Sequence, residues 1–152
     1  YDITIVNLAS QDPEAIVFGN GIPIDDGDRS PIESNNTDFG KRAINSDPNS
    51  NSFVIVNSGG INLDLLGPSP YVEITGDIND FTLTQIPDTP IEPLSSAAFE
   101  ITFNPTSEGI KSALITIANS DETKNPYTFS IQGEGFIPKP KIPCAYPPAP
   151  PS

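Results

Sequence analysis

Residues 98–104 read AFEITFN, a stretch in which large apolar side chains alternate with polar ones. Phe99, Ile101 and Phe103 lie on one face of an extended chain, because successive side chains of a strand point to opposite sides. This period of two is typical of a β-strand with one face buried in a core. The stretch therefore predicts a sheet whose apolar face forms part of the protein interior.

The same alternation, or a short run of β-branched residues, recurs along the chain. It is seen in ITIVNL at 3–8, AIVF at 15–18, FVIVN at 53–57, INLDL at 61–65, VEIT at 72–75, FTLTQ at 81–85, SALITIAN at 112–119 and YTFSIQ at 127–132. Turn residues separate these segments, and 18 Pro with 11 Gly leave few windows for an unbroken helix. Short strands without helical crossovers predict an all-β fold, an antiparallel β-sandwich of about 7–9 strands.

Two regions depart from this pattern. Residues 22–52 are polar, with only Phe39 and Ile44 as obvious apolar anchors, and predict a long ordered loop with at most one short strand. From Pro138 onward the sequence is rich in proline, which predicts an extended, polyproline-like tail. We therefore expect an N-terminal strand or linker over residues 1–12, one sandwich module over 13–137 and a tail over 138–152.

Acidic residues dominate the charge of the chain. The 20 Asp and Glu outnumber the 7 Lys and Arg, so the formal net charge is −13. Such a surface repels phosphate backbones and anionic lipids. No apolar run approaches the roughly 20 residues that span a bilayer. We therefore expect no nucleic-acid partner and no direct insertion into a membrane.

The residue types that carry most catalysis are sparse. The chain has no His, which removes the commonest general base and the commonest zinc ligand. Its single cysteine, Cys144, lies in the proline-rich tail and cannot form an internal disulfide. No G-x-S-x-G nucleophile elbow is present. We therefore expect a protein that is not an enzyme and that has no cofactor, with calcium as the one candidate ion.

The calcium candidate is the acidic stretch IDDGDRSP at residues 24–31. An EF-hand loop counted from Asp26 fails, because Pro31 stands where Gly is needed and Thr37 where Glu is needed. A looser site would use Asp25, Asp26, Asp28 and Asp38 as oxygen ligands. The alternative is an acidic turn whose Asp side chains accept backbone N–H bonds while Gly27 supplies a positive φ. Two further acidic clusters, at 76–80 and 119–122, have the same two interpretations.

The glycine-flanked triplet GEG at residues 133–135 follows a predicted strand and precedes proline-rich sequence. A phosphate-binding loop would need the N-terminus of a helix after it. The triplet therefore predicts the exit of the last strand at the end of the domain.

An ordered set of short segments resembles one known family. These segments are PEAIVFGNG at 13–21, IDDGD at 24–28, NTDFG at 36–40, FVIVNSG at 53–59, ITG at 74–76, DFTL at 80–83, FEITFNP at 99–105, Gly109, ITIANSD at 115–121 and NPYTFSIQGEG at 125–135. Together they resemble the choice-of-anchor D repeat, an immunoglobulin-like bacterial module related to the ASH and hydin group. The resemblance implies an immunoglobulin-like sandwich, repeated in tandem in secreted or surface proteins, without a catalytic motif.

Three functions follow as hypotheses. The first is a structural module, a spacer or building block of a secreted or surface-exposed bacterial stalk, adhesin or filament, with neighbouring modules or identical subunits as partners. The second is a carbohydrate- or protein-binding module that uses the loop predicted over residues 22–52. The third is a filament subunit that assembles when residues 3–8 add a strand to the sheet of a neighbour.

Overall fold

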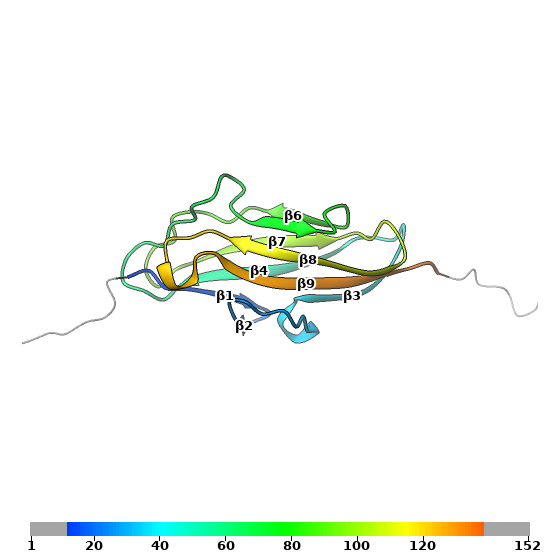
Figure 1. Ribbon diagram of the computed structural model, residues 1–152, viewed down its shortest axis with the longest axis horizontal. Helices are drawn as coiled ribbons and strands as arrows, with labels where there is room; N and C mark the ends of the chain where they lie inside the picture. The colour runs from blue at the N-terminus through cyan, green and yellow to red at the C-terminus, as the bar shows by residue number, and fades with distance from the viewer. Residues whose placement is uncertain (1–11, 139–152) are drawn as a thin grey trace, which may run out of the picture.

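The computed structural model describes residues 12–138, which form two β-sheets packed face to face (Figure 1). Two short 3₁₀ helices, η1 (Glu33–Asn35) and η2 (Glu122–Lys124), lie in the connections. Within the described residues the strands are β1 (Ala15–Gly19), β2 (Ile22–Ile24), β3 (Asp38–Ala43), β4 (Asn49–Asn57), β5 (Glu73–Gly76), β6 (Phe81–Gln85), β7 (Ser96–Phe103), β8 (Gly109–Ile117) and β9 (Tyr127–Phe136). The predicted all-β sandwich is confirmed. No helix among residues 12–138 is both long and apolar enough to cross a membrane.

The order of the strands defines an immunoglobulin-like fold. One sheet has the order β2-β1-β4-β7-β6 and the other β3-β9-β8-β5. Without β2 and β3, the seven remaining strands taken in chain order give the ABED and CFG sheets of that fold. Paired strands are antiparallel except β3, which runs parallel to β9, so the second sheet is mixed.

Aromatic rings fill the space between the sheets. Phe53 stacks on Phe99 with ring centroids 5.3 Å apart, and Phe81 stacks on Phe103 at 4.8 Å. Phe39 from β3 lies edge-on to Phe81 at 5.4 Å. All five side chains are buried, and those of Phe53, Phe99 and Phe103 point inward at the two-residue period of β4 and β7. The alternation in AFEITFN is therefore the inner face of β7, as predicted.

The prediction of one long loop with at most one short strand over residues 22–52 is wrong. This region contains β2, η1, β3 and the first residues of β4. In β3 only Phe39 is buried, and Gly40, at φ +76°, lies where the register with β9 shifts. This strand has no apolar alternation of its own. Its pairing with β9, and not a buried face, holds it in place.

Two smaller predictions, for residues 133–135 and 61–65, are also wrong. The triplet at residues 133–135 is not a strand exit, because β9 continues through it to Phe136. A Cβ on Gly133 would lie 2.5 Å from the ring of Phe103, so glycine permits the close packing of the two sheets there. Residues 61–65 form no full strand: Leu63 and Leu65 are buried but make only isolated bridges, to Ile91 and Asn119.

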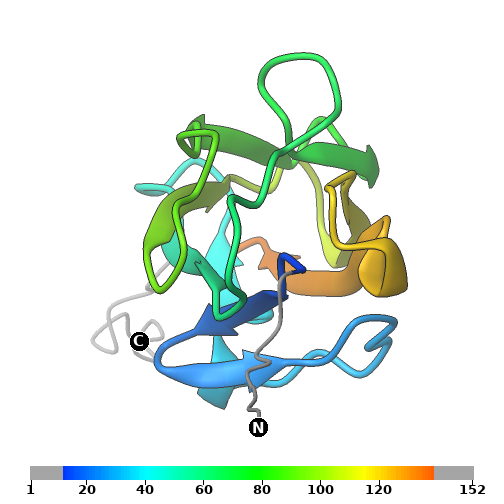
Figure 2. The ribbon, with the colours of Figure 1, turned by 90° about the vertical axis from the view of Figure 1, so that its left-hand side faces the viewer.

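The strands run along the long axis of the molecule, so the loops gather at two poles. The described chain enters at one pole and leaves at the other (Figure 1). The N-terminal pole, which faces the viewer in Figure 2, consists of residues 12–14, 58–72, 86–95 and 118–126. The C-terminal pole consists of residues 44–48, 77–80, 104–108 and 137–138. The strand predicted at 3–8 and most of the predicted tail lie outside the described residues.

Candidate functional site

The first three predicted calcium ligands lie in the turn that follows β2, beside the start of β9. The Asp26 carboxylate accepts the backbone N–H of Thr128 at 2.9 Å, and the Asp28 carboxylate accepts that of Ser30 at 2.8 Å. Asp25 joins the turn through its carbonyl, which accepts the N–H of Asp28 at 3.1 Å. Gly27 adopts φ +91°. The Asp26 carboxylate thus joins this turn to β9, whereas Asp25 and the Asp28 carboxylate bond within the turn.

The fourth predicted ligand, Asp38, opens β3. One carboxylate oxygen accepts the backbone N–H of Gly40 at 2.9 Å, and the other accepts the side-chain amide of Gln132 at 3.0 Å. Among residues 12–138, no three Asp, Glu or Cys side chains are grouped so that they could hold a metal ion. Calcium therefore stays a prediction, without a cluster of three carboxylates to support it.

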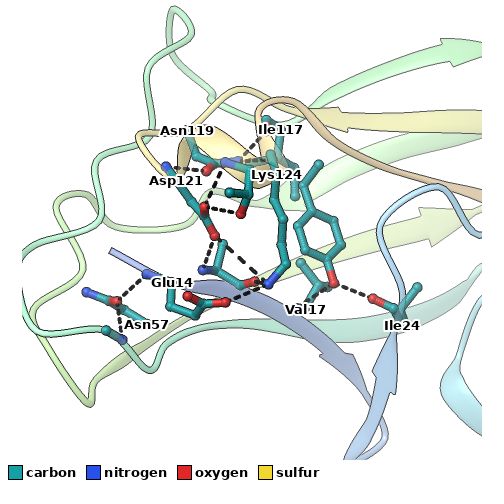
Figure 3. A network of polar contacts seen from close by, with 12 residues as sticks. Glu14, Val17, Ile24, Asn57, Ile117, Asn119, Asp121 and Lys124 are labelled. Atoms are coloured by element: carbon teal, nitrogen blue, oxygen red, sulfur yellow. Dashed lines mark hydrogen bonds and ion pairs between the residues drawn. The ribbon is translucent and has the colours of Figure 1, made fainter. Parts of the chain in front are cut away.

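A network of polar contacts lies at the N-terminal pole and is centred on Asp121 (Figure 3). This residue is only 3% exposed. It accepts the buried N–H of Ala15 at 2.9 Å, and the N–H and hydroxyl of Thr123 at 3.1 and 2.8 Å. The N–H of Asp121 is in turn donated to the side-chain oxygen of Asn119 at 2.8 Å. The cluster therefore joins the turn before β9 to the first strand.

A second buried side chain, Asn57 at the end of β4, joins the remaining loops of this pole. Its amide nitrogen donates to the carbonyls of Ile61 at 2.7 Å and Ile91 at 2.9 Å. Its oxygen accepts the N–H groups of Glu14 at 3.1 Å and Gly59 at 3.0 Å. One amide thus bonds to three segments of the N-terminal pole, which stabilises their relative positions.

Lys124 closes the polar cluster on its solvent side. Its ammonium lies 3.0 Å from the carboxylate of Glu14 and 4.0 Å from that of Asp121, and it donates to the carbonyl of Ala15 at 3.1 Å. Burial by itself would raise the pKa of Asp121. The hydrogen bonds from Ala15 and Thr123, together with the charge of Lys124, outweigh burial and leave this pKa below its ordinary value.

Tyr127, the first residue of β9, makes a buried link between the sheets. Its hydroxyl donates to the carbonyl of Ile24 and accepts the N–H of Val17 at 3.3 Å. Burial raises the pKa of this phenol, and the nearby carboxylates of Asp26 and Asp25 add to that effect. The hydroxyl is therefore held protonated, as a donor to the carbonyl of Ile24.

Exposed apolar side chains gather at both poles. At the N-terminal pole Ile61, Leu66, Ile86 and Leu94 are exposed, Leu94 at 82%. At or beside the C-terminal pole the exposed residues are Ile78, Ile110 and Ile137. Of the large apolar residues exposed in the described chain, only Ile22 and Ile32 lie elsewhere.

The N-terminal pole also carries a groove, here called the proline groove. Its volume is ≈ 320 Å³, and its walls are residues 67–73 together with Thr116 and Ala118. Pro68, Ser69 and Pro70 are exposed, whereas Tyr71 is half-buried and packs against the core. The lining is mainly apolar, with Glu73 as its one charged residue.

Only part of this end of the molecule was predictable from the sequence. The acidic cluster at 119–122 drew attention to Asp121, but Asn57, Lys124 and the hydroxyl of Tyr127 were not predicted to form a network. The local signal was an Asn at the end of each of two strands, at positions 57 and 119. The proline groove was not predicted.

Comparison with known proteins bears on the fold. No family model matches the chain, and no curated protein matches it. A protein of unknown function from Porphyromonas gingivalis W83 matches with a TM-score of 0.56 and 17% identity, over 84% of this chain and 49% of that protein. The chain thus spans about half of that protein. The ASH/PapD-like domain 7 of human CEP192 matches with a TM-score of 0.49 and 12% identity, over 89% and 92% of the two chains. At 17% identity the likeness to the Porphyromonas gingivalis protein is one of fold.

Proposed function

We propose that this chain is a non-catalytic structural module, a spacer or building block of a secreted or surface-exposed bacterial protein. The observation that carries the proposal is the position of its two ends. The described chain enters at the N-terminal pole and leaves at the C-terminal pole (Figure 1). Copies joined in sequence therefore follow one another along the long axis, and each adds its full length to a stalk or filament.

The strand pairing supports a load-bearing role. The parallel pairing of β3 with β9 joins Asp38 to Gln132 and Ala43 to Phe136. A pull at the N-terminal end first loads β1, which pairs with β4; once β1 and β2 detach, the pull reaches the start of β3, while β9 is drawn toward the C-terminal pole. The ladder is then loaded along its length, so its hydrogen bonds break together and not one after another.

The resemblance to the choice-of-anchor D repeat supports the finer part of this proposal. The pieces that carry it run in order through most of the described chain, and the family is one of tandem surface modules. The surface predicted for the alternative binding function is not one loop, because residues 22–52 include β2, η1 and β3.

Single-molecule stretching of the full chain between two marker domains tests the spacer role. We expect one force peak for the module, followed by an extension of roughly 400 Å as residues 12–138 unravel. Lys41→Pro in β3 lowers the peak force, because it disturbs the loaded ladder with β9. The control is Thr82→Pro in β6, an edge strand that lies outside the path of the load. Extension without a force peak in the unaltered chain would contradict the proposal.

A further inference from the structure

We propose that the proline groove binds the proline-rich segment 139–152 of a second copy of this chain. The resulting contact joins the C-terminal end of one molecule to the N-terminal pole of the next. This proposal does not depend on mechanical strength, so failure of the stretching experiment leaves it standing, and the reverse also holds.

The chemistry of the groove suits an extended proline-rich ligand. Polyproline segments dock in apolar grooves that contain an aromatic ring, because their extended shape is formed before binding and little entropy is lost. Here Pro68, Pro70 and Tyr71 all line the groove, and the Pro68 carbonyl accepts the N–H of Tyr71 at 2.9 Å in the turn that carries the ring.

Tyr71 adopts φ +75°, a conformation that is uncommon for a bulky residue. Such strained positions cluster where a protein holds a ligand. The strain at Tyr71 places a half-buried aromatic side chain in the wall of the groove. Its inner side packs against the core, which makes the wall rigid before any ligand arrives.

The segment KPKIPCAYPPAPPS at 139–152 matches this site in composition. It contains six prolines, the aromatic Tyr146 and two lysines, and no acidic residue. The described part of the chain holds 19 of the 20 carboxylates, and Glu73 lines the groove itself. Lys139 and Lys141 are therefore attracted to a surface that repels other parts of the same protein.

Geometry favours a groove on a second molecule over the molecule's own groove. The segment begins where the described chain leaves the C-terminal pole, whereas the groove lies at the N-terminal pole (Figure 1). As an extended polyproline helix its 14 residues reach about 43 Å. The ten residues of β9 alone span about 33 Å. A segment that turned back would use most of its length before it reached its own groove.

Complementation between two full-length variants tests the proposal. One variant carries Glu73→Lys at the groove, and the other carries Lys139→Glu with Lys141→Glu in the segment. Each variant retains one intact half of the contact. Sedimentation velocity is run under reducing conditions, so that Cys144 forms no disulfide, and over a hundredfold range of concentration. Because Glu73 is exposed, its substitution leaves folding intact, and thermal melting of each variant checks this.

The unaltered chain is expected to form linear oligomers whose mean mass rises with concentration. Each charge variant alone associates at least tenfold more weakly. In each variant alone, the groove and the segment carry like charges and repel each other. In the mixture, the groove of one variant and the segment of the other carry opposite charges, which restores association. Tyr71→Ala is a second groove variant with the same expected loss, and Glu92→Gln, in an exposed loop outside the groove, is the matched control that keeps full association. A monomeric unaltered chain, or oligomers that survive both the groove and the segment variants, would overturn the proposal.

Discussion

The replacement Asp121→Ala removes the centre of the polar cluster at the N-terminal pole, and its cost follows from the contacts of the carboxylate. The side chain of this buried residue, 3% exposed as a whole, accepts the N–H of Ala15 and both donors of Thr123. A hydrogen bond to a charged group contributes about 1.5–3 kcal/mol, and a buried donor left without a partner costs about 1–3 kcal/mol. The donors of Thr123 are part-buried and regain water. The lost Ala15 bond therefore dominates, and we expect a destabilisation of about 3 kcal/mol.

Urea denaturation followed by far-ultraviolet circular dichroism measures this change. With an m-value of about 1.5 kcal/mol per molar urea, a loss of about 3 kcal/mol lowers the midpoint by about 2 M. The matched control is Glu122→Ala, which removes the adjacent carboxylate in η2. Since Glu122 is exposed, its removal changes stability by no more than about 0.5 kcal/mol.

The pH dependence adds a second test of the same reasoning. The pKa of Asp121 is lower in the folded protein than its ordinary value of 3.8. A lowered pKa stabilises the fold fully above that ordinary value and ceases to do so as the pH falls through the folded-state pKa. The difference between the unaltered chain and Asp121→Ala is thus constant from neutral pH down to about pH 5 and shrinks below about pH 4. A difference under about 1 kcal/mol, or one equal to that of Glu122→Ala, would refute the assignment.

Three further predictions concern the hydroxyl of Tyr127, the packing at Gly133 and the binding of calcium. Tyr127→Phe leaves the carbonyl of Ile24 and the N–H of Val17 without their buried partner, and lowers the free energy of unfolding in urea by about 1–3 kcal/mol. Gly133→Ala places a methyl group 2.5 Å from the ring of Phe103, and thermal unfolding should show a loss of about 1–3 kcal/mol from overpacking. Calcium bound by the four predicted aspartates would raise the melting temperature by mass action, and EDTA would reverse the rise. Because three of the carboxylates already accept protein hydrogen bonds, we expect no shift, and a reproducible rise would establish the site.

The local sequence was sufficient to predict the strands whose own side chains build the core. In β7 the inward residues Phe99, Ile101 and Phe103 are all fully buried, and their alternation alone identified the strand. The same holds for Phe53 and Ile55 in β4. A strand with a large apolar side chain at every second position has one low-energy arrangement, in which its apolar face packs against a second sheet.

Strands that depend on distant partners could not be found in this way. In β3 a single buried side chain, Phe39, gives no period, and the strand exists because it pairs with residues about ninety positions later in β9. The end of β9 was missed for a related reason. Gly133 and Gly135 occupy inward positions of the alternation, but without side chains they are invisible to a count of apolar residues.

The same dependence on distant partners explains why the polar cluster was not predicted. The sequence at 119–122 shows acidic residues in a turn, and nothing local distinguishes the buried Asp121 from the exposed Glu122. The difference arises because the N–H of Ala15, 106 residues earlier, points at Asp121. Burial of a carboxylate is thus a property of the assembled pole, and only the three-dimensional structure reveals it.

The distribution of charge gives a reason why contact between copies should occur at the poles. With 19 carboxylates between residues 12 and 138, the described parts of two copies repel each other. Segment 139–152, which carries lysines and no acid, is free of that repulsion. Salt weakens the attraction of this segment for the groove and equally weakens the repulsion between the sides. Association through the poles therefore decreases as salt is added, whereas association side by side would increase. The sign of the salt effect on the mean mass thus distinguishes the two modes of contact.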